Sequence, residues 1–196
     1  MVLLGGAMRP ALTTADRFVE RVASATIGAT FNFYRDGDRA GLLRERLVRY
    51  LEAHEDAELL LVAEAPGYRG TRVSGIPLTS ERQLTGTGPA EATASIVHAA
   101  LEDLGLGRRV LLWNIVPTHP GNVAENRAPT RGEVEAGLPF VRALAGGRSI
   151  LPVGRVAQRA LGGTYLRHPS HGGAREFRRG LEAIAAGRAG PGRRLS

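Results

Sequence analysis

The sequence contains no cysteine and no lysine, and only 5% of its residues are aromatic. Without cysteine the chain can form no disulfide and no cysteine-ligated zinc or iron–sulfur site. Without lysine it has no side-chain amine that could form a Schiff base with a carbonyl group of a substrate. These absences exclude several kinds of covalent and cofactor chemistry, and they leave the cellular compartment open.

Long hydrophobic runs are also missing. Residues 1–8 (MVLLGGAM) have a short apolar stretch and no basic start, so they predict neither a signal peptide nor a membrane span. We therefore expect a cytoplasmic protein that does not associate with membranes. With 196 residues, 43% of them hydrophobic, the chain can bury the core of one domain. We place this domain at 1–186 and expect a monomer, with a flexible Gly- and Arg-rich tail at 187–196.

The charge is strongly positive. The formal net charge is +7, and all 26 basic residues are arginine. Such a balance indicates an anionic partner, such as DNA. Abundant alanine and glycine accompany the arginines, so a bias in coding composition explains the charge equally well. The charge alone leaves both explanations open.

Helical and strand-like patterns alternate along the chain. Apolar periodicity predicts helices at 12–23, 39–53, 89–104, 131–144, 155–161 and 174–186. Short apolar runs predict strands at 57–62, 110–116, 149–153 and 164–167. A Pro/Gly-rich loop is predicted at 66–77, after the first of these strands. Strands separated by helices predict an α/β fold, a three-layer α/β/α sandwich with a central four-stranded, mostly parallel sheet.

Three polar segments follow predicted strands. They are residues 63–70 (AEAPGYRG), the end of 111–114 (LLWN), and 168–170 (HPS). Loops at the carboxyl ends of parallel strands open into one crevice, so these segments are expected to meet. The sequence therefore predicts an active site there.

In their order and spacing, these segments resemble the motifs of the uracil-DNA glycosylase superfamily. The similarity rests on Glu64-Ala65-Pro66-Gly67, on the strand that ends in Asn114, and on His168-Pro169-Ser170, and it extends from about residue 57 to 180. It implies a monofunctional DNA-repair enzyme that hydrolyses the N-glycosidic bond of uracil and leaves an abasic site. The first motif is similar to a branch with an iron–sulfur cluster, which this cysteine-free chain cannot ligate. We expect no metal and no organic cofactor.

The chemistry of Asn114 and His168 fits this reaction. An amide offers one donor and one acceptor, which can pair with N3–H and O4 of a flipped uracil and mismatch cytosine. An imidazole N–H can stabilise the negative charge of the departing base, and the resemblance assigns His168 to the pyrimidine O2. In the alternative interpretations, Asn114 caps the next turn and His168 is an ordinary half-buried residue.

The first motif departs from the best-studied branch of the family. Ala65 stands where that branch has an aspartate, so Glu64, the nearest carboxylate, is predicted to be catalytic. Gly67 stands where the branch has a tyrosine that excludes the thymine methyl, which predicts open space beside the base unless Tyr68 fills it. Leu78 takes the place of an aromatic residue that stacks on uracil. The predicted substrate contacts are Ala65, Pro66, Gly67, Tyr68, Leu78, Asn114 and His168.

The region after His168 is predicted to bind DNA. The family's wedge leucine is missing, so His171 or Arg175 is expected to enter the base stack, although a simple turn before the last helix is the alternative. The predicted DNA contacts are Ser170, His171, Gly172, Gly173, Arg175 and Arg69, with Arg72 and Arg127 as further phosphate ligands. A metal site at His168 and His171 is not expected, because no acidic residue lies close in sequence. His54, His98 and His119 are interpreted as structural.

Two other functions remain open. Gly67 and Leu78 favour a glycosylase for another damaged or 5-substituted pyrimidine. The missing aspartate would also fit a nucleic-acid-binding protein that keeps the fold and has lost catalysis.

Overall fold

The core of the protein is a parallel sheet of three strands. The computed structural model describes residues 12–187, so all but the first residue of the predicted tail lies outside the described residues. Strands β1 (Leu59–Ala63), β2 (Val110–Asn114) and β3 (Ser149–Pro152) pair in the order β2-β1-β3. Their apolar sequences suit strands that are covered on both faces.

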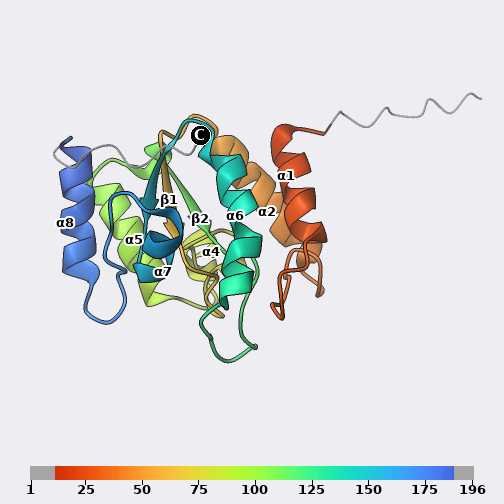
Figure 1. The fold of residues 1–196 in the computed structure, drawn as a ribbon. Helices are drawn as coiled ribbons and strands as arrows, with labels where there is room; N and C mark the ends of the chain where they lie inside the picture. Colours follow the sequence, from red (N-terminus) through yellow and green to blue (C-terminus); the bar gives the residue numbers. More distant parts are fainter. Residues whose placement is uncertain (1–11, 188–196) are drawn as a thin grey trace, which may run out of the picture.

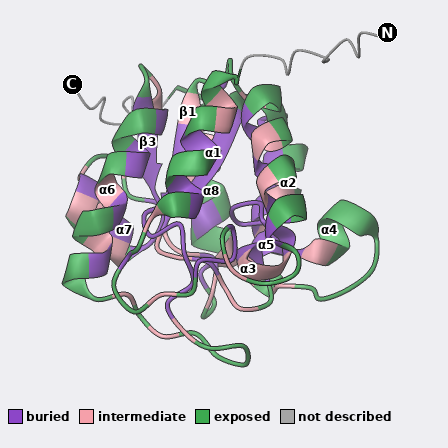
Figure 2. Cartoon of the chain, turned by 90° about the vertical axis from the view of Figure 1, so that its right-hand side faces the viewer, coloured by how far each residue is buried: buried purple, intermediate pink, exposed green. Residues whose placement is uncertain are grey.

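Helices cover both faces of this sheet (Figure 1). α5 (Ala92–Asp103) and α8 (Ala174–Ala185) pack on one face. α1 (Thr14–Ser24), α2 (Ala40–Ala53), α6 (Arg131–Ala145) and α7 (Arg155–Leu161) contribute to the core on the other. The short helices are α3 (Thr71–Ser74), α4 (Glu81–Thr85) and the 3₁₀ turn η1 (Gly107–Arg109). The predicted three-layer α/β/α architecture is confirmed. Figure 2 shows that the long helices turn buried residues inward and exposed residues outward.

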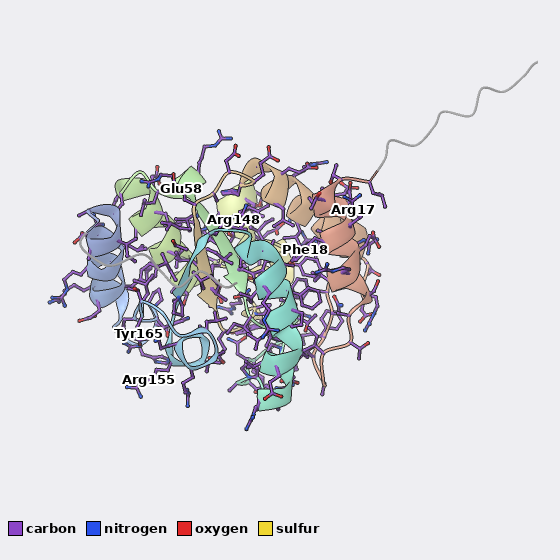
Figure 3. All side chains as sticks on the ribbon, turned by 45° about the horizontal axis from the view of Figure 1, so that its top comes forward. Arg17, Phe18, Glu58, Arg148, Arg155 and Tyr165 are labelled. Atoms are coloured by element: carbon purple, nitrogen blue, oxygen red, sulfur yellow. The ribbon has the colours of Figure 1, made fainter. Side chains whose placement is uncertain are left out.

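Successive side chains along each strand pack alternately against the helical layers on the two faces of the sheet. On β1, Leu60 and Val62 face the α1/α2/α6 side, and Leu61 faces α5 and α8. Phe18 points from α1 into the core, edge-on to Trp113 with ring centroids 5.3 Å apart, whereas its neighbour Arg17 is exposed (Figure 3). The apolar stripe of the first predicted helix thus fixes α1 against the strand that ends in Asn114.

Two predictions about local structure were wrong. The segment 164–167 is not a strand: within the described residues it pairs with the sheet only through Leu166, in one parallel bridge to Val153. Leu166 donates to the Pro152 carbonyl and accepts from the Gly154 amide, both at 2.9 Å. Two glycines with positive φ, Gly162 and Gly163, precede this segment, and a proline follows it soon after. The extended stretch between them is therefore too short to form further strand pairs. The predicted loop at 66–77 also contains the helical turn α3.

Helix α6 lies unusually close to the backbone that follows β2. A Cβ atom on Gly137 would collide with the carbonyl oxygen of Ile115, the residue after Asn114. Ile115 and Val116 in turn continue the ladder, donating to the carbonyls of Ala63 at 2.8 Å and Glu64 at 3.1 Å. The end of β2 is therefore fixed on two sides.

Within residues 12–187, no helix is both long enough and apolar enough to cross a bilayer.

Candidate active site

The three polar segments meet at the carboxyl ends of the strands. They line one pocket of about 380 Å³, as the strand-end rule predicts. Its walls come from Ala63, Glu64, Ala65, Pro66, Gly67, Thr71, Leu78, Glu91, Thr93, Asn114, Pro120, Asn126, Arg127, His168, Ser170 and His171. Tyr68, one of the predicted substrate contacts, does not line this pocket. Its ring lies beside the Arg69 guanidinium, 5.5 Å from ring centroid to Cζ.

Asn114 lies at the base of the pocket. It pairs in register with Ala63, so the sheet fixes its backbone. The residue is only 2% exposed, and its Oδ1 has no hydrogen-bond partner in the described part of the chain. The side chain therefore does not cap the following turn. A buried acceptor without a donor costs free energy, which is the pattern expected of a group that binds a ligand.

His168 is held in one orientation by Ser170. The Ser170 backbone N–H donates to His168 Nδ1 at 3.2 Å, and the Ser170 hydroxyl lies 2.7 Å from the same nitrogen. Burial lowers the pKa of His168, and the nearby side chains of Arg167 and His171 lower it further. In the neutral ring, Nδ1 is the acceptor and Nε2 carries the hydrogen. Ser170 thus orients the histidine, and its predicted DNA contact stays a prediction.

The rest of the predicted DNA-binding segment divides between buried and exposed residues. Gly173 is buried, and a Cβ atom there would collide with the His168 carbonyl, so glycine at this position serves the packing of the His-Pro-Ser turn. His171, Gly172 and Arg175 are exposed. His171 has a positive φ of 51° and lines the pocket.

Glu64 follows β1 and lines the pocket. Its carboxylate makes no hydrogen bond within residues 12–187. Burial raises its pKa, while the positive charge of Arg159 acts in the opposite direction. A half-buried carboxyl with a raised pKa is suited to proton transfer or to orienting water.

A second pocket carboxyl, Glu91, was not predicted from the sequence. It is half-buried just before α5, and burial raises its pKa. A Cβ atom on either Gly67 or Gly70 would collide with its carboxylate oxygens. The open space expected beside Gly67 is therefore wrong, because Glu91 fills it. Glu91 lies 27 positions after Glu64 and outside any motif, so no local pattern marked it.

The first motif is also held from the side of the loop between β2 and α6. His119, which is fully buried, places Nδ1 2.8 Å from the Pro66 carbonyl, and Asn126 Oδ1 accepts from the Tyr68 backbone N–H at 2.8 Å. His119 was predicted to be structural, and the structure gives that role a location: it supports the pocket wall. The role of Asn126 was not predicted.

Leu78 enters the pocket from a strained backbone. Its φ is +53°, a rare conformation for a residue with a branched side chain, and it is 6% exposed. Its backbone N–H donates to the Thr71 hydroxyl at 3.1 Å, and the next residue, Thr79, bonds His98 Nε2 at 2.9 Å. These bonds hold the loop so that Leu78 reaches the pocket.

The loop arginines differ in availability. Arg127 forms a two-pronged ion pair with buried Glu133, at 2.6 and 2.8 Å, so its guanidinium already has a partner. Arg69 is exposed, and Arg72 lies 5.4 Å from the centroid of the Phe31 ring. The phosphate contacts of all three arginines stay predictions.

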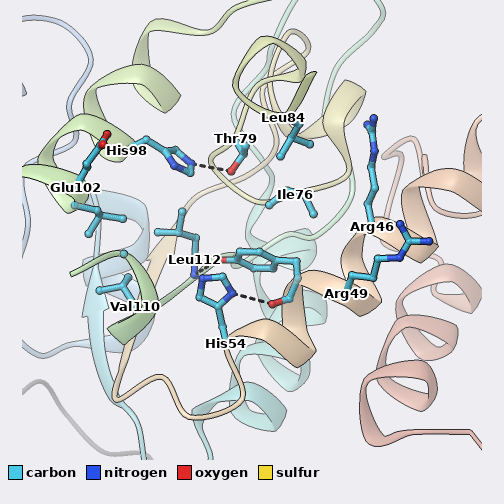
Figure 4. Close-up of a pocket in the computed structure, with 13 residues that line it drawn as sticks. Arg46, Arg49, His54, Ile76, Thr79, Leu84, His98, Glu102, Val110 and Leu112 are labelled. Carbon is cyan, nitrogen blue, oxygen red and sulfur yellow. Dashed lines mark hydrogen bonds between the residues drawn. The ribbon is translucent and has the colours of Figure 1, made fainter. Parts of the chain in front are cut away.

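A larger cavity, of about 610 Å³, lies between α2, α5 and the loop before α4 (Figure 4). It includes Val110 and Leu112 of β2, and its histidines, His54 and His98, bond the Tyr50 carbonyl and the Thr79 hydroxyl. None of the predicted site residues lines it.

Within residues 12–187, no cluster of three or more histidine, aspartate or glutamate side chains is arranged to hold a metal ion.

The fold and the pocket define a three-layer α/β/α protein whose strand ends carry an amide, an imidazole and carboxyl groups in one cleft. The family model of the uracil DNA glycosylase superfamily matches residues 51–186, and the chain belongs to this superfamily of DNA glycosylases. The solved structures that resemble it include the crystal structure of wild-type SMUG2 from Pedobacter heparinus. That comparison has a TM-score of 0.64 and 13% sequence identity, and it covers 88% of this chain and 95% of the other. A search of curated proteins finds no significant match.

Proposed function

We propose that this protein hydrolyses the N-glycosidic bond of uracil in DNA. The observation that carries the proposal is the buried Oδ1 of Asn114, which has no hydrogen-bond partner within residues 12–187 and lies in the same pocket as the neutral imidazole of His168. An amide oxygen in this position requires an N–H donor, and the amide nitrogen requires an acceptor. The N3–H and O4 of uracil supply both on adjacent atoms.

The reaction breaks the bond between N1 of the base and C1′ of the sugar, and the electron pair of that bond leaves with the base. The Nε2–H of His168 stabilises the resulting charge at O2 of the base. Water forms the new bond to C1′, and its lost proton passes to the Glu64 carboxylate and then to solvent or the base. The products are free uracil and an abasic sugar that carries a hydroxyl at C1′.

An excision assay with uracil-containing oligonucleotides tests this proposal. We expect free uracil and an intact strand with an abasic site, because the chain has no lysine that could form a Schiff base and cleave the strand. The products are measured by chromatography of the released base and by alkaline cleavage of the strand. No release with enzyme in excess would favour a DNA-binding protein without catalysis. A borohydride-trapped adduct would contradict a monofunctional mechanism.

A glycosylase for 5-substituted pyrimidines is a second candidate, favoured by Leu78 in place of a stacking aromatic residue. Glu91 bears directly on it. With O2 at His168 and the N3/O4 edge at Asn114, the C5 side of the ring faces the remaining wall, formed by the first motif and Glu91. The Glu91 carboxylate then limits the size of the substituent that the base can carry at C5.

We expect Glu91→Ala to increase excision of 5-hydroxymethyluracil and thymine relative to uracil by about ten-fold or more, as is usual when a pocket gains room for one small group. Rates on the three bases, each placed opposite guanine, give the ratio. Glu102→Ala is the control, because it removes an exposed carboxylate of α5 that lines the larger cavity. An unchanged ratio in Glu91→Ala would remove Glu91 from the base-binding wall.

A further inference from the structure

The loop between β2 and α6 carries an exposed apolar side chain at its tip. Gly121 and Asn126 form an antiparallel bridge, and Val123 lies in the turn that they close. Val123 is 73% exposed, the highest value among the large hydrophobic side chains of residues 12–187. The loop projects beyond the body of the protein at the bottom of Figures 1 and 2.

Hydrogen bonds hold this turn in shape. Asn122 Oδ1 accepts from the backbone N–H groups of Ala124 at 2.8 Å and Glu125 at 3.1 Å. Asn122 Nδ2 donates to the Glu125 carboxylate at 2.7 Å, and the Asn122 carbonyl lies 2.9 Å from His119 Nε2. A side chain on such a turn keeps its position when a partner approaches, since little further order has to be imposed.

The base of the turn is part of the active-site rim. Pro120 and Asn126, on its two sides, line the pocket, and Asn126 holds the backbone of Tyr68 in the first motif. Arg69, the next residue after Tyr68, is exposed and can bind a phosphate of a DNA strand that lies across the rim. Single exposed apolar residues are common on protein surfaces, but this one stands on a hydrogen-bonded turn whose base lines the pocket.

A base that enters the pocket leaves a gap in the duplex, and apolar side chains are suited to fill such gaps because they replace the lost stacking contacts without needing hydrogen bonds. His171 and Arg175, the wedge candidates from the sequence, are both polar. We propose that Val123 inserts into the base stack of duplex DNA beside the extruded nucleotide. This inference rests on the proposed glycosylase function.

The test compares duplex with single-stranded DNA. We expect Val123→Ala to lower uracil excision from duplex DNA by about ten-fold, because the gap is no longer filled, and to leave excision from single strands within about two-fold of the parent. Val123→Leu, which keeps an apolar wedge, should retain duplex activity. Leu84→Ala removes an exposed apolar side chain beside the larger cavity and should change neither rate. Equal losses on both substrates, or full duplex activity in Val123→Ala, would overturn the proposal.

A second measurement does not depend on catalysis. 2-Aminopurine placed next to a non-cleavable uracil analogue in duplex DNA becomes brighter when it is unstacked. The parent protein and Val123→Leu should increase its fluorescence at saturating protein, and Val123→Ala should not. If the parent releases no uracil from either substrate but still brightens the probe in a Val123-dependent manner, then the proposed function fails and the wedge stands. An identical signal from all three proteins would contradict the wedge.

Discussion

Replacing His168 with alanine is expected to lower the rate of uracil excision by about 10²–10³-fold, the usual loss when one preorganised hydrogen-bond donor is removed from developing negative charge. The ring is already in place without substrate, because the backbone and hydroxyl of Ser170 bond its Nδ1. Single-turnover rates with enzyme in excess measure the loss at the chemical step. His54→Ala, which removes a histidine that lines the larger cavity, should stay within a few-fold of the parent. A His168→Ala rate in that same range would reject the assigned role.

The same histidine should shape the pH profile. Its pKa is lowered from 6.5, so the neutral ring predominates at neutral pH. As the pH falls through this lowered pKa, Nδ1 gains a hydrogen that faces the Ser170 N–H, and the bond that orients the ring is lost. Excision should therefore be constant around neutral pH and fall on the acid side below 6.5. A rate that depends on His168 yet stays constant through this acid range would show that the neutral ring is not required.

Asn114→Ala is expected to lower excision by a similar factor of about 10²–10³, with little loss of stability. The two effects separate because the Asn114 Oδ1 makes no hydrogen bond within residues 12–187, so its removal breaks no bond of that oxygen there. Thermal unfolding and single-turnover excision, measured on the same preparation, test both statements.

Asn32→Ala is the matched control, because Asn32 is a buried asparagine with a structural role. Its Nδ2 donates to the carbonyls of Val22, Ala23 and Ala25 at 2.9–3.1 Å, and its Oδ1 accepts from the Tyr34 N–H at 3.1 Å. We expect this variant to unfold at a lower temperature and to keep its specific activity while folded. The Asn114 assignment fails if Asn114→Ala instead loses stability and keeps its rate.

The sequence was sufficient for the parts of the fold that depend on local patterns. Apolar runs predicted the three paired strands, and because parallel strands end at one edge, the first motif and Asn114 could be placed in one pocket from the sequence. The segment 164–167 shows the limit. Its apolar composition suits a strand, but whether more than Leu166 pairs depends on the path of the flanking glycines, which composition does not determine.

The residues missed in the site belong to contacts between segments far apart in the chain. Glu91 matters because it fits against Gly67 and Gly70, and Asn126 because it accepts from Tyr68. The sequence shows the glycines as possible turns and gives no indication of what fills the space beside them. Motif positions could therefore be predicted, and the side chains that surround them required the packed structure.

The pairing of Ala63 with Asn114 has a consequence for how this pocket can change during evolution. Because the two residues are neighbours across one ladder, the distance between the start of the first motif and the amide is set by the spacing of strands and not by any loop. Insertions or replacements in the loops around residues 67–91 and 117–127 can then alter the walls without moving the floor. The protein can acquire a new selectivity by exchanging surface segments while the two strands stay in register.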